Sequence, residues 1–172
     1  YEAKPKSWTP QRALTEFTRL INRTLHQESL ARFDRAEMVS TLAAAVIEGD
    51  RLYGVNVGDS RVCLVRNGEV NVLSQDHVDD IRTNVLSRAL GMETNVEPHL
   101  FEIDLRDGDV AMLCSDGVSN HYTNETLSDA LRHRTTARAI VKSARKLATS
   151  ESLDDMSAIV LDIAETGRLR FM

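Results

Sequence analysis

The chain has 172 residues, of which 42% are hydrophobic and 27% charged, a balance that is ordinary for a soluble globular protein. Its formal net charge of -5 argues against a nucleic-acid-binding surface, which needs a basic face. No apolar run approaches the roughly 18 residues that would cross a bilayer, and no signal peptide opens the sequence. Because the chain begins with Tyr1, we expect a processed or partial protein.

The first 35 residues are predicted to form an irregular leader and one helix. Residues 1–8 show no hydrophobic period. Thr9 and Pro10 are typical of a helix N-cap and a first-turn proline. Helical spacing of apolar residues then predicts an amphipathic helix to about Phe33. The apolar face of this helix would carry Leu14, Phe17, Ile21 and Leu25.

A meander of short strands follows the helix. Alternating or continuous apolar runs predict strands over 42–47, 53–57, 61–65, 70–72, 101–105, 110–114 and 157–163. Asn67-Gly68 is the strongest hairpin signal in the chain, and Glu48-Gly49-Asp50 has similar turn chemistry. Hairpins dominate and strands do not alternate with helices, so the sheets should be mostly antiparallel.

Helical patterns lie between and after some of these strands. Residues 78–90 fit either a short helix or an irregular segment. Two further helices are predicted, one after Thr123-Asn124 and one over 137–147. We therefore expect an α+β fold in one domain, 1–172, with helices on the outer faces of the sheets and a tail over 164–172.

Aspartates at strand ends are the most informative feature. Asp59 follows one strand, Asp116 follows the apolar strand 110–114, and Asp154 with Asp155 precedes the last strand. Converging carboxylates repel one another unless a hard cation such as Mg2+ or Mn2+ lies between them. Each motif taken alone is also compatible with a solvated turn.

Other reactive side chains give weaker signals. Ser60 would be a nucleophile only beside a base, and the sequence shows none nearby. His77 follows Asp76, but no Cys or His at zinc spacing accompanies it. Cys63 and Cys114 each lie within an apolar run, which predicts reduced packing residues and a cytoplasmic location. We assign no catalytic side chain.

Taken together, these motifs resemble the metal-dependent serine/threonine protein phosphatases, the type 2C phosphatases. The resemblance is colinear from about residue 36 to 163. It rests on Met38-Val39-Ser40-Thr41-Leu42, Leu52-Tyr53-Gly54-Val55-Asn56-Val57-Gly58-Asp59-Ser60-Arg61, Arg66-Asn67-Gly68-Glu69, Gln75-Asp76-His77, Arg88-Ala89-Leu90-Gly91, Val96-Glu97-Pro98, Gly108-Asp109, Leu113-Cys114-Ser115-Asp116-Gly117-Val118 and Asp154-Asp155-Met156-Ser157.

The resemblance implies two mostly antiparallel sheets between outer helices, an αββα sandwich. It implies hydrolysis of phosphoserine and phosphothreonine in proteins by a water that bridges two Mn2+ or Mg2+ ions. By position, Asp116 and Asp154 would be ligands of the core metal centre, and Asp76 would help to hold a third, weaker ion. In the family's scheme, Asp59 and Arg61 are structural. The implied partners are a phosphorylated protein and a cognate Ser/Thr kinase.

Departures from the family pattern limit this reading. The family's N-terminal strands are absent, with their phosphate-binding arginine and Asp-Gly-His-Gly signature, and neither Glu2 nor Glu16 has the context to replace them. Val39 and Asp155 stand where glycine and asparagine are usual. The segment between His77 and Arg88 is short, similar to bacterial phosphatases associated with kinases. We therefore expect an N-terminally incomplete sandwich that carries only part of the site.

The missing strands lead to two further expectations. An inactive, phosphatase-like regulatory or interaction module is the alternative function. An exposed sheet edge would also be left behind, and such an edge favours a dimer.

Overall fold

The structure is a computed structural model, which describes residues 4–33, 38–82, 85–133, 135–149 and 154–164, and the strand over 168–171. Twelve elements are assigned there. They are α1 (Pro10–Phe33), β1 (Leu42–Glu48), β2 (Arg51–Val57), β3 (Arg61–Arg66), β4 (Glu69–Val72), β5 (His99–Asp104), β6 (Val110–Cys114), α2 (Asp116–Ser119), α3 (Asn124–Arg132), α4 (Ala137–Leu147), β7 (Ala158–Ala164) and β8 (Arg168–Phe171). No helix within these ranges is long and apolar enough to cross a bilayer.

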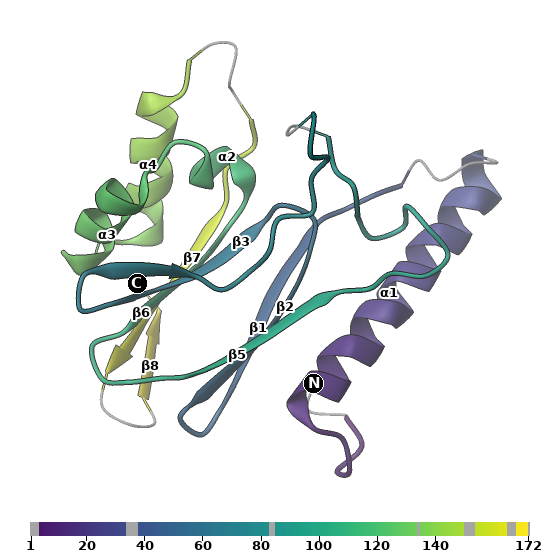
Figure 1. The fold of residues 1–172 in the computed structure, drawn as a ribbon, viewed down its shortest axis with the longest axis horizontal. Coiled ribbons are helices and arrows are strands. Elements are labelled where there is room, and N and C mark those ends of the chain that lie inside the picture. The colour runs from purple at the N-terminus through teal and green to yellow at the C-terminus, as the bar shows by residue number, and fades with distance from the viewer. Residues whose placement is uncertain are drawn as a thin grey trace.

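The strands form two sheets in which every neighbouring pair is antiparallel. One sheet has the order β1-β2-β5 and the other has the order β4-β3-β6-β7-β8. Helix α1 lies on the outer side of the smaller sheet, and α3 and α4 lie on the outer side of the larger one (Figure 1). The predicted αββα sandwich is confirmed.

Apolar side chains of both sheets form the layer between them. Its buried members come from both sheets and include Leu52, Leu64, Ala111 and Leu161. A second core fills the space between the larger sheet and α3 and α4, where Leu131 and Ile140 are fully buried. Burying side chains of this size contributes roughly 1.5–3 kcal/mol each.

Turn chemistry sets the register of the hairpins. Between β3 and β4, Asn67 (φ 52°) and Gly68 (φ 86°) both have left-handed backbone, the conformation that a two-residue hairpin turn requires. The β1–β2 hairpin closes at the pair Glu48–Arg51 across Gly49-Asp50. Both predicted turns are confirmed.

The two cysteines are packing residues. Cys63 and Cys114 are 2% and 5% exposed, and both are free thiols. Burial raises the pKa of Cys63 to about 12 and that of Cys114 to about 11. Both thiols are therefore protonated at neutral pH.

The buried face of α1 differs from the face predicted by the apolar spacing. Leu14 is buried as expected, but Ile21 is 44% exposed. The fully buried positions include Thr18, Asn22 and Ser29. This polar face of α1 is buried because Asn22 hydrogen-bonds the loop that precedes β5. A count of apolar residues does not detect such hydrogen bonds.

The chain also differs from prediction at two short elements. A single helical turn, α2, follows β6 where only a strand end was expected, and β8 lies within the predicted tail. The described part of 78–90 is irregular and is held by the isolated bridges Val78–Leu86 and Ser40–Leu90. Glu2 lies outside the described residues, and so does Ala36, at which the family resemblance begins.

Candidate metal centre

Three strand ends of the larger sheet meet at one place. Cys114, the last residue of β6, pairs with Arg61 at the start of β3 and with Ala158 at the start of β7. In antiparallel pairs, the end of one strand lies beside the start of its neighbours. The aspartates that flank these strands, Asp59, Asp116 and Asp154, therefore lie at the same end of the larger sheet. Helix α2 marks this end in Figure 1.

Asp116 occupies the first turn of α2 and is half-buried. Its Oδ1 accepts a hydrogen bond from the backbone N–H of Gly117 at 2.8 Å. Its Oδ2 accepts no hydrogen bond from the described part of the chain.

Gly117 lets the segment that carries Asp154 pack closely against the residue that follows Asp116. A Cβ at Gly117 would lie 2.6 Å from the carbonyl oxygen of Asp155 and 3.3 Å from Cβ of Asp154. Only a residue without a side chain allows the two segments to approach so closely. Asp154 itself is exposed, and its Oδ1 accepts the N–H of Asp155 at 2.7 Å.

Ser115 fixes this approach from the other side. Its Oγ donates to the carbonyl of Asp155 at 3.2 Å and accepts from the N–H of Ser157 at 3.0 Å. Its own N–H donates to the carbonyl of Ser157 at 3.1 Å. The segment that carries Asp154 is thus held against the end of β6 by three hydrogen bonds.

Asp76 is engaged in an ion pair. Arg61 Nε donates to both of its carboxylate oxygens, at 3.1 and 3.0 Å, and Nη2 donates to Oδ2 at 2.6 Å. The hydrogen bond with Asp76 raises the pKa of Arg61. Asp76 can serve a cation only by sharing oxygens that Arg61 already holds, so it fits a metal role less well than the other two aspartates.

The carboxylates at this end affect one another electrostatically. Burial raises the pKa of Asp59 above its ordinary value, and the negative charges of Asp116 and Asp76 raise it further. Repulsion of this kind is relieved when a cation binds between the carboxylates. The sequence predicted that Asp59 and Asp116 repel one another at the strand ends, and the family resemblance gave Asp59 a structural role.

His77 and Ser60 have structural contacts. Nδ1 of His77 accepts the N–H of Gly58 at 3.0 Å, and its Nε2 lies 3.1 Å from Nη1 of Arg88. Burial lowers the pKa of His77, and the positive charge of Arg88 lowers it further. Ser60 Oγ lies 2.8 Å from Thr41 Oγ1, with no base bonded to it among the described residues. The contact with Arg88 has no signal in the sequence, because the two residues are 11 positions apart in an irregular segment.

The donor set suits a hard divalent ion but is incomplete. Oxygen ligands from carboxylates are those preferred by Mg2+ and Mn2+. In the described ranges, no three His, Cys, Asp or Glu side chains come together closely enough to hold a metal. Asp116 and Asp154 therefore have the chemistry of ligands for such an ion, but the described residues alone do not complete a site.

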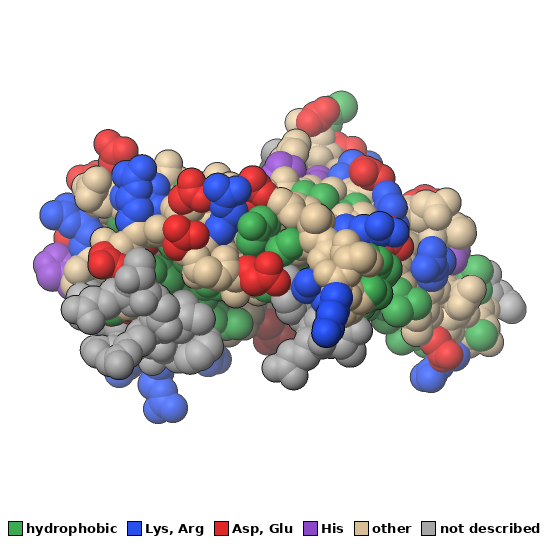
Figure 2. Space-filling view, turned by 90° about the horizontal axis from the view of Figure 1, so that it is seen from below, with side chains coloured by type: hydrophobic (Ala, Val, Ile, Leu, Met, Phe, Trp, Pro, Cys, Tyr) green, Lys and Arg blue, Asp and Glu red, His purple; other side chains and the backbone are tan. Residues whose placement is uncertain are grey.

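Ion pairs, one of them with a buried aspartate, occupy the opposite end. There Arg51 pairs with Glu102 and Asp104, and Arg66 pairs with the buried Asp109. Figure 2, seen from that side, shows basic and acidic side chains interspersed across the surface. Each of these arginines is thus paired with a carboxylate at this end.

The profile of the Stage II sporulation protein E (SpoIIE) family matches residues 2–164. The serine/threonine phosphatase stp of Listeria monocytogenes serotype 4b (strain F2365) is 27% identical over 168 residues, covering 86% of this chain and 67% of that protein. The serine/threonine protein phosphatase PstP of Mycobacterium tuberculosis (strain CDC 1551 / Oshkosh) is 31% identical over 150 residues, covering 77% of this chain and 29% of that protein. This chain thus spans only part of its relatives.

Solved structures share the fold. The catalytic domain of PstP in complex with two manganese ions superposes with a TM-score of 0.77 at 27% identity, covering 95% of this chain and 75% of that one. PppA of Pseudomonas aeruginosa, described as a key regulatory component of T6SS, gives a TM-score of 0.76 at 28% identity, covering 93% and 69%. The chain therefore shares the fold of these two structures.

Proposed function

Because the chain belongs to the Stage II sporulation protein E (SpoIIE) family of metal-dependent serine/threonine phosphatases, the type 2C phosphatases, we propose that it takes part in hydrolysing phosphoserine and phosphothreonine in proteins. The observation that carries the proposal is the close approach of the Asp154-Asp155 segment to Gly117, the residue that follows Asp116 at the end of β6. We treat 1–172 as one phosphatase-like domain.

Mn2+ or Mg2+ is the proposed cofactor, with Asp116 and Asp154 as ligands of two core ions and Asp76 beside a third. When bound, such ions lower the pKa of a water molecule and neutralise charge on a phosphoryl group. The residues of this chain orient the ligands. Ser115 holds the Asp154 segment in place, and Arg61 fixes the carboxylate of Asp76.

We also propose that this chain carries only part of the site and is inactive alone. Two adjacent carboxylates are fewer than the ligands of a complete metal site. The relatives named above are longer than this chain, which leaves room for further ligands in a segment outside residues 1–172.

An inactive regulatory module is the second candidate function. It is favoured by the ion pair that occupies Asp76 and by the absence of any group of three metal-binding side chains in the described ranges. Such a module would keep the fold and bind a partner instead of turning over a substrate.

A phosphorylated protein and a cognate Ser/Thr kinase are the proposed partners, and a dimer through a sheet edge is a further proposal. β1 is an outer strand of its sheet, and its residues from Leu42 to Ile47 are only half-buried although all are apolar. Outer strands with apolar side chains favour pairing with another chain. Sedimentation that shows a clean monomer at high concentration would count against the dimer.

The cytoplasmic location stays a prediction, supported by two free, buried thiols.

Phosphate release separates the two candidate functions. The chain and any longer natural form should be assayed with p-nitrophenyl phosphate and a phosphothreonine peptide, with Mn2+, Mg2+ or EDTA. We expect activity only in a longer form and only with metal. In that form Asp116→Asn should lower the rate more than about 100-fold, since even outer-shell changes at metal sites cost 10–100-fold. The matched control is Asp129→Asn, an exposed aspartate on α3. Full activity in EDTA would exclude the proposed chemistry.

A further inference from the structure

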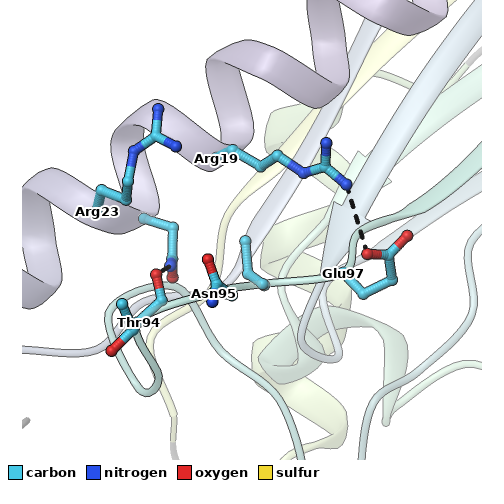
Figure 3. A pocket seen from close by; sticks show the side chains of 7 residues that line it. Arg19, Arg23, Thr94, Asn95 and Glu97 are labelled. Atoms are coloured by element: carbon cyan, nitrogen blue, oxygen red, sulfur yellow. Dashed lines mark hydrogen bonds and ion pairs between the residues drawn. The ribbon is translucent and has the colours of Figure 1, made fainter.

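One flank of α1 faces the loop that precedes β5 and encloses a pocket there. The pocket has a volume of about 420 Å3 and is lined by Arg19, Asn22, Arg23, Thr94, Asn95, Val96 and Glu97. Figure 3 shows Arg19 and Arg23 projecting from the helix beside Thr94 and Asn95 of the loop. This volume is within the usual range of ligand pockets, roughly 300–1,000 Å3.

The wall of the pocket is held by hydrogen bonds between α1 and the loop. Asn22 is 1% exposed; its Nδ2 donates to the carbonyls of Glu93 and Thr94 at 3.0 and 3.2 Å, and its Oδ1 accepts the N–H of Gly91 at 2.8 Å. His26, one turn further along α1, contacts the carbonyl of Gly91 through Nδ1 at 2.9 Å and Thr94 Oγ1 through Nε2 at 3.3 Å. The loop therefore holds its place before any ligand arrives.

Gly91 allows this close packing. Its φ is +82°, and a Cβ there would lie 2.3 Å from the carbonyl oxygen of Met38. The loop thus follows a backbone path that only glycine tolerates easily. A pocket made in this way is preformed, which lowers the entropic cost of binding a ligand.

The described residues neutralise the positive charge in the pocket only in part. Arg23 is exposed, and no carboxylate of the described residues lies within ion-pair distance of it. Arg19 has two long contacts, 3.6 Å to Glu16 and 3.5 Å to Glu97, between partly exposed side chains. Exposed pairs of this kind contribute only about 0–1 kcal/mol, so Arg19 remains available to a stronger anion.

We propose that this pocket binds a phosphoryl group, as free phosphate or on a phosphorylated peptide, between the guanidinium groups of Arg19 and Arg23. The two arginines are four positions apart, about 6 Å along the helix, so both can reach one anion. Each offers a planar fork of N–H donors that matches phosphate oxygens. Asn95, whose side chain makes no hydrogen bond to the described residues, adds an amide donor.

The pocket is separate from the candidate metal centre, and contacts of Arg88 connect its loop to the neighbour of Asp76. Neither Asp116 nor Asp154 lines it. Arg88 Nη1 donates to the carbonyl of Glu97 at 2.6 Å and lies 3.1 Å from Nε2 of His77, the neighbour of Asp76. The loop that lines the pocket is therefore connected through Arg88 to His77, and phosphoryl binding there does not depend on the proposed hydrolysis.

The test is an NMR titration of the 15N-labelled chain with inorganic phosphate and, separately, with a phosphoserine peptide, in EDTA and at constant ionic strength. We expect saturable shifts of the amides of residues 94–97. Arg23→Gln should weaken binding by at least about tenfold, and Arg23→Lys less, because lysine keeps the charge but not the fork. Arg32→Gln is the matched control on the same helix, where the arginine already pairs with Glu28.

The same titration contains the outcomes that overturn the proposal. No saturable shift at residues 94–97, equal affinity in wild type and Arg23→Gln, or an equal response to acetate would each do so. The amide spectrum of each variant without ligand checks that it is folded. Saturation by the peptide alone would assign the site to phosphorylated segments, and saturation by both would assign it to the phosphoryl group itself.

Discussion

Gly117→Ala tests how the metal ligands are brought together. The added methyl would lie 2.6 Å from the carbonyl oxygen of Asp155, and real contacts of this kind are at least 3.0 Å. The segment carrying Asp154 must therefore retreat by about 0.4 Å or more, against the three hydrogen bonds made by Ser115. Overpacking of this type costs typically 1–3 kcal/mol, and Gly→Ala recovers about 0.4–1 kcal/mol from the unfolded state.

The net expectation is a loss of about 1–2 kcal/mol of unfolding free energy. For a chain of this length, that lowers Tm by roughly 2–8 °C. Because the ligand segment moves, the affinity for Mn2+ should also fall, by about tenfold. Differential scanning calorimetry and Mn2+ titration measure the two effects separately.

Gly49→Ala is the control for Gly117→Ala. Gly49 has φ +64°, and no heavy atom lies within 4 Å of the place that an alanine methyl would take, so alanine there costs backbone strain of about 1 kcal/mol without any clash. It should lower Tm by a similar amount and leave Mn2+ affinity unchanged. The reasoning is refuted if Gly117→Ala matches wild type in both Tm and Mn2+ affinity.

Three further predictions concern the site and the core. Arg61→Leu removes the bidentate partner of Asp76 and should cost about 1.5–3 kcal/mol in urea unfolding; an unchanged midpoint would show that this pair contributes nothing. Cys63 and Cys114 should resist a thiol reagent at pH 8 until the chain unfolds, because burial raises their pKa to about 12 and about 11; rapid labelling of the native chain would contradict this. Gly54→Ala places a methyl against the ring of Phe101 on β5 and should lower the free energy of unfolding by about 1–3 kcal/mol. Wild-type stability would contradict this prediction.

Much of the fold follows from local rules that act on neighbouring residues. The hairpin at Asn67-Gly68 was predictable because two left-handed residues in a row leave few alternatives. The helix that begins after Thr9 was predictable because Thr9 Oγ1 accepts the N–H of Arg12, a contact encoded within four residues. Its buried face was not, because Asn22 is buried by hydrogen bonds to a loop about 70 positions away.

The candidate site divides in the same way. Strand-end positions of Asp116 and Asp154 follow from the strand pattern, and their common location follows from antiparallel pairing of β6 and β7. The ion pair of Asp76 with Arg61 was not predicted. An arginine can pair with many carboxylates, and the sequence does not say which one lies beside it in the fold. The roles of Asp76, Asp116 and Asp154 as ligands stay predictions.

Calorimetric titration of the 172-residue chain with Mn2+ tests the central claim most directly. If Asp116 and Asp154 form part of a metal centre, wild type should bind Mn2+ weakly, and Asp116→Asn and Asp154→Asn should each abolish the binding. Asp129→Asn, an exposed aspartate on α3, should leave it unchanged. Binding that is undiminished in both site variants would contradict the assignment of these two carboxylates.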